Sequence, residues 1–325
     1  MSQTPDSSVD TVRTAAGRVA EAVRESVVGQ ETAAETLLAA YVAGGHALIE
    51  GVPGIAKTLL ARAFASSLGL KFSRVQFTPD LMPSDLLGSN VFDQASAAFR
   101  LVHGPVFTEV LMADEVNRTP PKTQSALLEC MQERQVTIDG VSHVLPLEFF
   151  VIATQNPVEF EGTYPLPEAQ LDRFIVRVDM GLPPRAAELE IYRRAVAGTL
   201  VGWGSDQPLP GAVVGPGEAA ALRRASRRVH VAPELLDYVA SLAEAVRRSP
   251  RVEIGVSPRG ALALIEIARA FALVGGRDFV TPDDVKRGLE PSWAHRVLLT
   301  SEAEIENETP AQVLGRLAGS VPVPR

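Results

Sequence analysis

The segment Gly51-Val52-Pro53-Gly54-Ile55-Ala56-Lys57-Thr58 nearly matches a phosphate-binding loop. The usual pattern is a glycine, four free positions, a second glycine and then Lys-Ser/Thr, and here an alanine replaces the second glycine. The apolar stretch "HALIE" precedes the segment, and "TLLARAFASSLGL" follows it with one apolar stripe at helical spacing. This order of strand, loop and helix predicts a nucleotide cradle. A Gly/Pro turn before a helix with an incidental lysine is the alternative.

In such a cradle each residue has its own task. We expect the backbone N–H groups of residues 54–58 to point at the phosphates, with the helix dipole behind them. Lys57 would contact the β- and γ-phosphates and Thr58 would bind Mg²⁺. A positive φ at Ala56 would cost about 1–2 kcal/mol, but this residue directly precedes the helix. We therefore predict a negative φ there, and nucleotide binding within a few-fold of normal for Ala56→Gly.

A second candidate site lies in "VLMADEVNR", where an apolar strand ends in Asp114 and Glu115. Buried carboxylates are costly unless they bind something. We expect Asp114 to hold the water shell of Mg²⁺ and Glu115 to act as the general base that polarises an attacking water. Two carboxylates solvated at a strand end are the alternative.

Two polar residues suggest contacts to the terminal phosphate. The strand "FFVIATQNP" ends at Asn156, whose amide could orient water or touch phosphate, although a plain turn before Pro157 is also consistent. Arg259 falls in the first turn of a predicted helix, where a cation opposes the helix dipole. Such local rule-breaking tends to mark function, with a surface arginine as the alternative.

Five apolar runs alternate with helical patterns up to about residue 182. They cover residues 46–51, 71–77, 110–115, 149–156 and 174–180. Three runs are apolar at nearly every position, which is typical of strands buried on both faces of a parallel sheet. The sequence therefore predicts an α/β layer fold, with ligands at the carboxyl ends of the strands.

After residue 182 the pattern changes to helices, interrupted by a Gly/Pro-rich stretch at 201–218. We predict a smaller helical domain over residues 187–325, without a recognisable strand. Ser257-Pro258 and Thr281-Pro282 mark two helix starts, since each places a capping hydroxyl before a proline. Residues 1–24 form a helical extension by periodicity, but the pattern leaves open whether it packs or hangs loose.

Composition narrows the function classes. The chain has 325 residues, 46% of them hydrophobic, and a formal net charge of -8, which argues against nucleic acid as a partner. The basic "LRRASRRVH" (222–230) is interpreted as a solvated helix face. The single cysteine, Cys130, excludes a disulfide framework and is expected to be a buried thiol. The histidines show no ligand spacing, so we predict no transition-metal site, and without a membrane-length apolar run we expect a cytoplasmic protein.

The longer motifs resemble those of MoxR-type AAA+ ATPases. They are "VVGQE", "GHALIEGVPGIAKTLLARA", "VQFTPDLMPSDLLG", "GPVFTEVLMADEVNRTPPKTQSALLECMQERQVTIDG", "FFVIATQNPVEFEGTYPLPEAQLDRF" and "VSPRGALALIEIARAFALVGGRDFVTPDDV". The resemblance covers roughly residues 25–290. It implies a P-loop AAA+ α/β domain over 25–182, a parallel sheet flanked by helices, and a second, all-helical lid domain over 187–325.

The resemblance also implies roles for individual residues. Asp114 with Thr58 would bind Mg²⁺, Glu115 would be the base, and Asn156 and Arg259 would be sensors 1 and 2. Arg173 would be an arginine finger that reaches a neighbouring subunit, although a helix-end cation is an equally good interpretation. The remaining implied nucleotide contacts are Val27, Val28, Gly29 and Gln30 at the adenine, and Gly51, Pro53, Gly54, Ile55, Ala56, Lys57, Thr58 and Leu59 in the loop.

Two insertions fit the same resemblance. Asp139-Gly140 within residues 135–145 is a strong hairpin signal, and it precedes the sensor 1 strand as a pre-sensor hairpin would. Residues 84–104 match a helix-2 insert, with Val91/Phe92 and Phe99/Leu101 flanking a small loop. In relatives both project toward the pore or the partner-binding face, and a solvated surface loop is the alternative for each.

The function implied is ATP hydrolysis in an oligomeric ring, usually a hexamer, that remodels or activates partner proteins. Partners in this family often carry von Willebrand factor A domains. In this hypothesis the lid moves against the α/β domain while Arg259 and Asn156 sense the same phosphate. A chelatase-type motor subunit, a DNA-helicase motor, a nucleotide-gated assembly module with little turnover and a small-molecule phosphotransferase are the alternatives.

Overall fold

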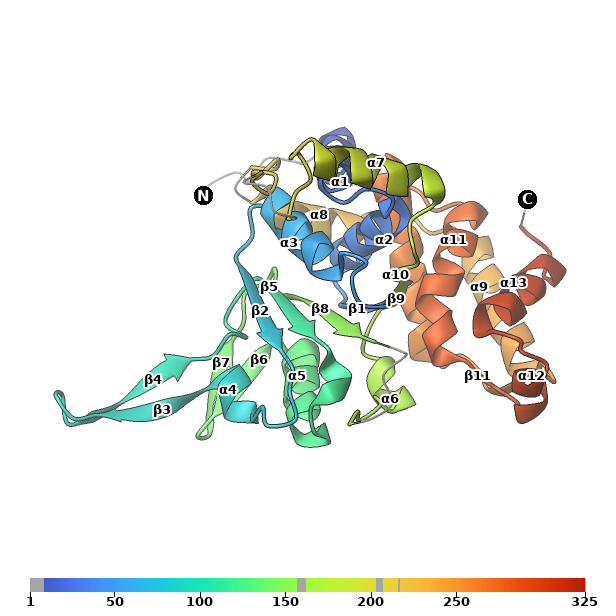
Figure 1. Ribbon diagram of the computed structural model, residues 1–325. Helices are drawn as coiled ribbons and strands as arrows, with labels where there is room; N and C mark the ends of the chain where they lie inside the picture. Colours follow the sequence, from blue (N-terminus) through green and yellow to red (C-terminus); the bar gives the residue numbers. More distant parts are fainter. Residues whose placement is uncertain (1–8, 157–161, 203–206, 216, 325) are drawn as a thin grey trace, which may run out of the picture.

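The computed structural model describes residues 9–156, 162–202, 207–215 and 217–324. Its centre is a parallel sheet of five strands (Figure 1). In sheet order these are β2 (Phe72–Gln76), β5 (Val110–Asp114), β8 (Phe150–Gln155), β1 (Ala47–Glu50) and β9 (Val176–Asp179). All five predicted runs are therefore strands, and all pair in parallel. The three central strands are buried almost throughout, which explains their continuous apolar sequences.

Helices cover both faces of this sheet. On one face, Ile49 and Met112 join a core with α2 (Glu31–Val42) and α3 (Lys57–Ser67). On the other face, Leu48 and Leu111 join a second core with α5 (Pro121–Glu133). Alternate residues of each strand thus point to opposite cores, as the pleat requires. The predicted α/β class is confirmed.

The N-terminal segment is a packed helix from Val9 onward. Helix α1 (Val9–Ser26) packs against α2, α3, α8 (Glu218–Ser226) and α10 (Pro258–Val274). Its buried side chains recur at helical spacing: Val12, Ala15, Ala16, Val19 and Val23. The helical periodicity of the predicted extension at 1–24 is therefore a core-facing stripe, and the helix ends two residues beyond the predicted boundary. Residues 1–8 lie outside the described part.

The lid lies at one side of the sheet, to the right in Figure 1. It contains α9 (Pro233–Arg248), α10, α11 (Pro282–Trp293), η2 (Ala294–Arg296), α12 (Ser301–Ile305) and α13 (Pro310–Ser320). Both predicted helix starts are confirmed. Ser257 Oγ accepts from the Gly260 N–H at 3.1 Å, and Thr281 and Asp284 cap each other reciprocally at the start of α11.

Three features of the region after residue 182 go beyond the sequence prediction. Two short strands, β10 (Val252–Ile254) and β11 (Leu298–Leu299), form an antiparallel pair that was not predicted. Helix α8 packs against α1 and α2, so it also belongs to the layer above the sheet. Helix α7 (Arg185–Val196) is tied to the same layer, because Arg194 Nη1 donates to the Glu25 carbonyl at 2.7 Å.

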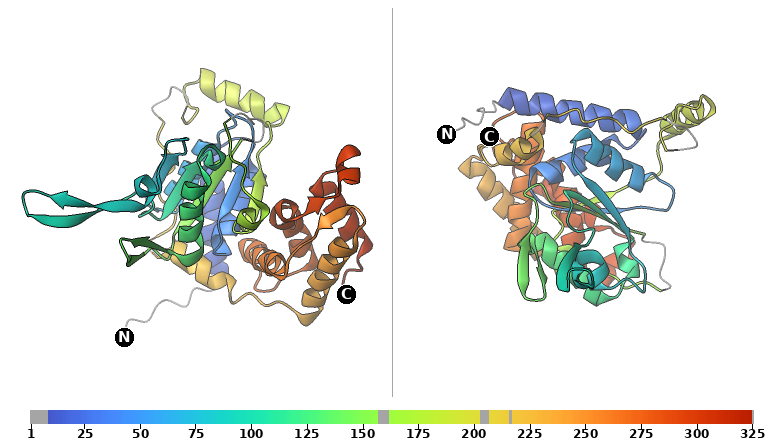
Figure 2. Two further views of the ribbon diagram at one scale, coloured as in Figure 1. Left: turned by 90° about the horizontal axis from the view of Figure 1, so that it is seen from below. Right: turned by 90° about the vertical axis from the view of Figure 1, so that its left-hand side faces the viewer.

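Two β-hairpins project from the other side of the sheet (Figures 1 and 2). The segment predicted as an insert folds into α4 (Pro83–Leu87) and the antiparallel strands β3 (Gly88–Asp93) and β4 (Ala98–His103). The predicted Asp139-Gly140 turn joins β6 (Gln135–Ile138) to β7 (Val141–Val144), with positive φ at both turn residues. Asn90 Nδ2 donates to Asp139 Oδ2 at 2.7 Å, which links the hairpins. Across the described ranges, no helix is both long and apolar enough to cross a bilayer.

Candidate nucleotide-binding site

The loop between β1 and α3 has glycines where the backbone demands them. A Cβ on Gly51 would lie 2.2 Å from Ile55 Cδ1 and 2.6 Å from the Met180 carbonyl oxygen, so a side chain does not fit there. Gly54 has a φ of +85° with open space around it. Both positions favour glycine, for steric and conformational reasons respectively. The loop is therefore a tight turn that leaves room above Gly54.

Ala56 corrects the prediction of a negative φ. Its φ is +70° and its ψ is 26°, so the residue is left-handed and immediately precedes α3. Position 56 directly precedes the helix as expected, since α3 begins at Lys57, but the negative φ of the helix does not extend back to this residue. The left-handed conformation of Ala56 turns the chain from the loop into the first turn of α3. A glycine at this position would adopt the conformation without strain, which is the physical reason for the usual pattern.

The N-terminus of α3 is suited to an anion. An alanine at the N-cap offers no side-chain acceptor, and the first turn, Lys57-Thr58-Leu59-Leu60, contains no acidic residue. The positive dipole end of this helix therefore favours an external anion. Lys57 Nζ donates to the Gly51 carbonyl, which holds the lysine over the loop. Thr58 is partly exposed beside it.

Glu50, the last residue of β1, fixes the start of this loop. Burial raises the pKa of the Glu50 carboxyl, against the opposing effects of Arg177 and a hydrogen bond from Gln155. Arg177 Nε lies 3.7 Å from Glu50 Oε2, and Gln155 Nε2 donates to Oε1. Strands β8 and β9 thus anchor the end of β1 from both sides.

Asp114 ends the neighbouring strand β5 and is held by two other strands. It is 7% exposed. Oδ1 accepts from Thr154 Oγ1 at 2.5 Å, and Oδ2 accepts from Arg74 Nε at 3.0 Å and Nη2 at 2.7 Å. A carboxylate and a hydroxyl such as that of Thr58 are hard oxygen donors of the kind that Mg²⁺ prefers, and protein sites usually leave the other positions to phosphate and water.

Glu115 follows in a left-handed conformation, with φ 58°. Its N–H donates to Thr154 Oγ1 at 2.9 Å. Its Oε2 accepts from Gln76 Nε2 at 2.7 Å and from Arg118 Nη1 at 3.2 Å. The side chain of the proposed base is thereby held by β2 on one side and by the following turn on the other.

Sequence reasoning missed Arg74, Gln76, Thr154 and Arg118. Gln76 is paired in register with Asp114, and Arg74 lies two residues earlier on the same face. Polar residues at alternate positions of "FSRVQ" were the available signal, since this strand is at the edge of the sheet and its polar side faces the carboxylates. Asn156 directly follows β8, is 4% exposed and lies at the same edge of the sheet as the loop. Residues 157–161 lie outside the described part.

The predicted adenine contacts, residues 27–30, and the phosphate-binding loop both lie against the segment that follows β9. A Cβ on Gly29 would lie 2.7 Å from Ala187 Cβ and 2.9 Å from Pro183 Cβ, which requires glycine in this left-handed position. Gln30 Nε2 donates to the Gly181 carbonyl at 2.9 Å. Gly51 contacts Met180, the residue before Gly181, so residues 27–30 and the loop share one neighbour segment.

Arg259 and Arg173 lie elsewhere, so Arg259 and Asn156 of the same chain do not converge on one phosphate, contrary to the expectation for a single chain. Arg259 Nε is 3.8 Å from Asp172 Oδ2, beside Arg173. Asp172 and Arg173 precede β9, at the end of the sheet opposite the loop, because Ile175, directly before β9, donates to the carbonyl of the residue before β1. Four strand residues span about 13 Å. The structure therefore groups the two arginines with each other and not with Lys57 of the same chain.

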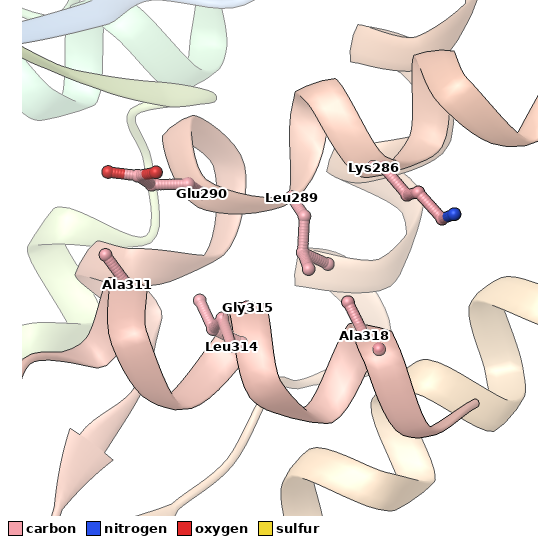
Figure 3. Close-up of a pocket in the computed structure, with 8 residues that line it drawn as sticks. Lys286, Leu289, Glu290, Ala311, Leu314, Gly315 and Ala318 are labelled. Carbon is pink, nitrogen blue, oxygen red and sulfur yellow. The ribbon is translucent and has the colours of Figure 1, made fainter.

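The lid has a separate small groove. It lies between α11 and α13, with a volume of about 350 Å³ (Figure 3). Leu289, Leu314 and Ala318 line it, and Lys286 and Glu290 lie at its rim. All lining residues belong to these two helices, so the groove contains none of the predicted site residues.

Comparisons with known proteins agree with this arrangement. Residues 46–176 match the family described as "ATPase family associated with various cellular activities (AAA)", and residues 244–317 match the AAA lid domain. The chain is 40% identical to Chaperone MoxR1 of Mycobacterium tuberculosis, covering 93% of this chain and 81% of the relative. It is 32% identical to Protein MoxR of Methylorubrum extorquens, covering 95% and 94%.

A solved structure shares the fold over the whole chain. It is the crystal structure of a protein of Cytophaga hutchinsonii that is described as a candidate ATPase. The TM-score is 0.87 at 38% sequence identity, covering 98% of this chain and 97% of that one. A likeness of this extent, together with the MoxR relatives and the two matched domains, leads to one conclusion. The chain belongs to the MoxR family of AAA+ ATPases.

Proposed function

We propose that the protein hydrolyses ATP with Mg²⁺ and uses the turnover to remodel partner proteins. One observation supports the proposal of hydrolysis. The loop 51–58 leads into a helix N-terminus without a side-chain cap, and the adjacent carboxylates Asp114 and Glu115 lie at the end of a strand of the same sheet. A cradle for phosphates beside a metal ligand and a base is the arrangement that phosphoryl transfer to water requires.

The residues divide this work as follows. The N–H groups at the start of α3 and the ammonium of Lys57 would hold the phosphates, and Thr58 and Asp114 would hold Mg²⁺. Bound Mg²⁺ neutralises charge on the phosphates. Glu115 would accept a proton from the attacking water, and Asn156 would orient that water or the leaving phosphate. Residues 27–30 would contact the adenine.

The position of Arg173 and Arg259 supports action between subunits. Both belong to the end of the sheet opposite the loop, and therefore lie away from their own chain's nucleotide site. A head-to-tail ring would bring them to the loop of a neighbour. We propose that Arg173 is the finger in such a ring, with a hexamer as the expected size. An arginine acting in trans contributes about 10³–10⁵ in rate in related phosphoryl transfer.

Client binding is proposed for the two projecting hairpins. Phe92 and Phe99 face each other across β3 and β4 with ring centroids 5.4 Å apart, and they are 52% and 72% exposed. Exposed aromatic pairs of this kind are suited to protein contacts. The relative named as a chaperone supports remodelling as the output, and a von Willebrand factor A protein is the partner class proposed from the family resemblance. The cytoplasmic location expected from the sequence stays a prediction.

The test separates binding, chemistry and assembly. Lys57→Ala should abolish ATP binding, whereas Glu115→Gln should bind ATP with near-normal affinity but hydrolyse it at least 100-fold more slowly. Particle size should increase when ATP and Mg²⁺ are added, and Glu115→Gln should accumulate the larger species. Normal hydrolysis by Glu115→Gln would refute the base assignment, and a particle that stays monomeric at every concentration would refute the ring.

A further inference from the structure

Arg296 of the lid is buried against the segment that contains Arg173. Its side chain is 5% exposed. Nε donates to Asp172 Oδ1 at 2.6 Å, and Nη2 donates to the carbonyls of Asp172 at 3.0 Å and Phe174 at 2.8 Å. Nη1 donates to the Ile175 carbonyl at 3.3 Å and to Ser292 of the preceding helix. One guanidinium therefore holds the backbone on both sides of Arg173.

A second lid residue, His295, also contacts the backbone beside Arg173. His295 Nε2 lies 3.0 Å from the Phe174 carbonyl, and burial lowers the pKa of this imidazole well below its usual range. A neutral imidazole with the proton on Nε2 donates to that carbonyl. Arg259, from the start of α10, approaches the same Asp172 carboxylate at 3.8 Å. Residues of the lid thus contact Asp172 and Phe174, the two neighbours of Arg173.

Stability alone is a weak explanation for this cluster. Burying a charged pair costs several kcal/mol of desolvation, and well-packed apolar residues often stabilise a core as well or better. A planar guanidinium that donates several hydrogen bonds also fixes the orientation of the groups that accept them. Here the groups are the peptide units from which the Arg173 side chain departs.

We propose that Arg296 is a positioning residue that makes the direction of Arg173 depend on the lid. The inference rests on the proposed role of Arg173 as a finger in trans. Because Arg259 shares the Asp172 carboxylate, the lid, its sensor arginine and the finger form one mechanical unit. A lid that moves in one subunit would then change how that subunit's finger meets the next subunit's nucleotide.

The first experiment uses Arg296→Lys, which keeps the charge but cannot span several acceptors at once. Its matched control is Arg251→Lys, because Arg251 pairs with Glu306 and Glu308 within the lid. We expect kcat of Arg296→Lys to fall at least tenfold with the Kd for ADP within twofold of wild type, and the control to keep both within twofold. A displacement of about 1 Å can cost as much as 100-fold. An unchanged kcat would overturn the proposal.

Mixing subunits distinguishes positioning from simple damage. Arg296→Lys subunits keep an intact loop, and Lys57→Ala subunits keep an intact finger, so an equimolar mixture should recover roughly a quarter of the wild-type rate if subunits assort randomly in a head-to-tail ring. Asp172→Asn is a second variant that keeps the carbonyl acceptors, and we expect the same recovery from a smaller initial loss. The reference is Arg173→Ala mixed with Lys57→Ala.

The outcomes are separable. If the Arg173 mixture recovers and the Arg296 mixture does not, Arg296 acts on its own pocket or on folding, and the positioning role is wrong while the ring mechanism stands. If neither mixture recovers, the finger in trans is wrong and the inference falls with it. Recovery of ATP hydrolysis in both mixtures supports the proposal that Arg173 acts in trans and is positioned by the lid of its own subunit.

Discussion

Arg74 on β2 donates from both Nε and Nη2 to a single oxygen, Oδ2, of Asp114 on β5. The arginine side chain is 47% exposed, whereas the carboxylate side chain is 10% exposed. Arg74 Nη2 also donates to Gln76 Oε1 at 2.9 Å, and Gln76 in turn holds Glu115. A half-exposed cation therefore neutralises the buried carboxylate that is proposed to bind Mg²⁺, and it is joined to the proposed base.

Arg74→Met should destabilise the ligand-free protein by about 1–2 kcal/mol, because it leaves the Asp114 carboxylate without its cation; the exposure of Arg74 keeps the loss below that of a fully buried pair. The loss should shrink when Mg²⁺ and ADP are added, since a divalent cation then neutralises the same carboxylate. Thermal unfolding with and without Mg-ADP measures both numbers. Arg100→Met, on the exposed strand β4, is the control and should change stability by less than about 0.5 kcal/mol. Equal losses in both conditions would show that Arg74 and the metal do not share Asp114.

Ala56→Gly should stabilise the folded protein, reversing the sign expected from a negative φ. Relief of the left-handed strain is worth about 1–2 kcal/mol, and the greater freedom of glycine in the unfolded chain removes about 0.4–1 kcal/mol of that gain. Urea unfolding should therefore show a net gain of about 0.5–1 kcal/mol. Ala97→Gly, at φ 50° in the turn of the β3–β4 hairpin, should show the same gain without any change in nucleotide affinity. A loss of stability in Ala56→Gly alone would contradict the left-handed conformation.

The sequence was informative where one local pattern decides the structure. Continuous apolar runs such as "VLMAD" predicted the buried strands, and Ser257-Pro258 predicted a helix start, because each signal lies within a few residues. Asp139-Gly140 likewise predicted the hairpin. The α/β class and the place of the loop, Asp114 and Asn156 at one edge of the sheet follow from such signals, because the strands are parallel.

What the sequence could not supply depends on distant segments. Arg74 reaches Asp114 because β2 pairs with β5 in one particular register, and 40 residues separate the two side chains in the chain. Arg259 is placed by the packing of the lid on the segment before β9, which no local pattern reports. The φ of Ala56 depends on how the loop from Gly51 enters α3, and no local pattern reports it even though the helix starts after residue 56 as expected. The strand β11 has two residues, too few for any periodicity.

Cys130 should be almost inert toward thiol reagents in the folded protein. The residue is 2% exposed in α5, and burial raises the pKa of its thiol to about 12. At pH 8 the folded protein should react with an aromatic disulfide reagent at least about 10³-fold more slowly than the denatured chain, because reaction requires opening of the core. Denatured protein should give one thiol per chain. Fast labelling without denaturant would mean that the α5 face of the sheet opens readily.

His46 should make stability fall as the pH is lowered from neutrality. Its Nδ1 accepts from the Val151 N–H at 3.0 Å, its Nε2 lies 3.0 Å from the Met131 carbonyl, and burial lowers its pKa from 6.5 to about 3. Since the folded-state pKa is the lower one, the unfolded chain takes up the proton first. The contribution is complete above about pH 6.5 and is lost progressively toward pH 3, with a slope of up to about 1.4 kcal/mol per pH unit.

The measurement compares slopes, because His295 is a second buried imidazole whose lowered pKa acts in the same direction. Urea unfolding of wild type and His46→Asn at pH 7.5, 6.0 and 5.0 should show lower stability for the variant at neutral pH, because the buried partners Val151 and Met131 lose a matching side chain. Between pH 6.0 and 5.0, above most carboxyl titrations, wild type should lose about 1 kcal/mol more than the variant, which is the linkage expected for one proton. If stability falls with pH by the same amount in both proteins, His46 takes up its proton equally well in the folded and unfolded chains. The hydrogen bond from the Val151 N–H would then not require a neutral imidazole.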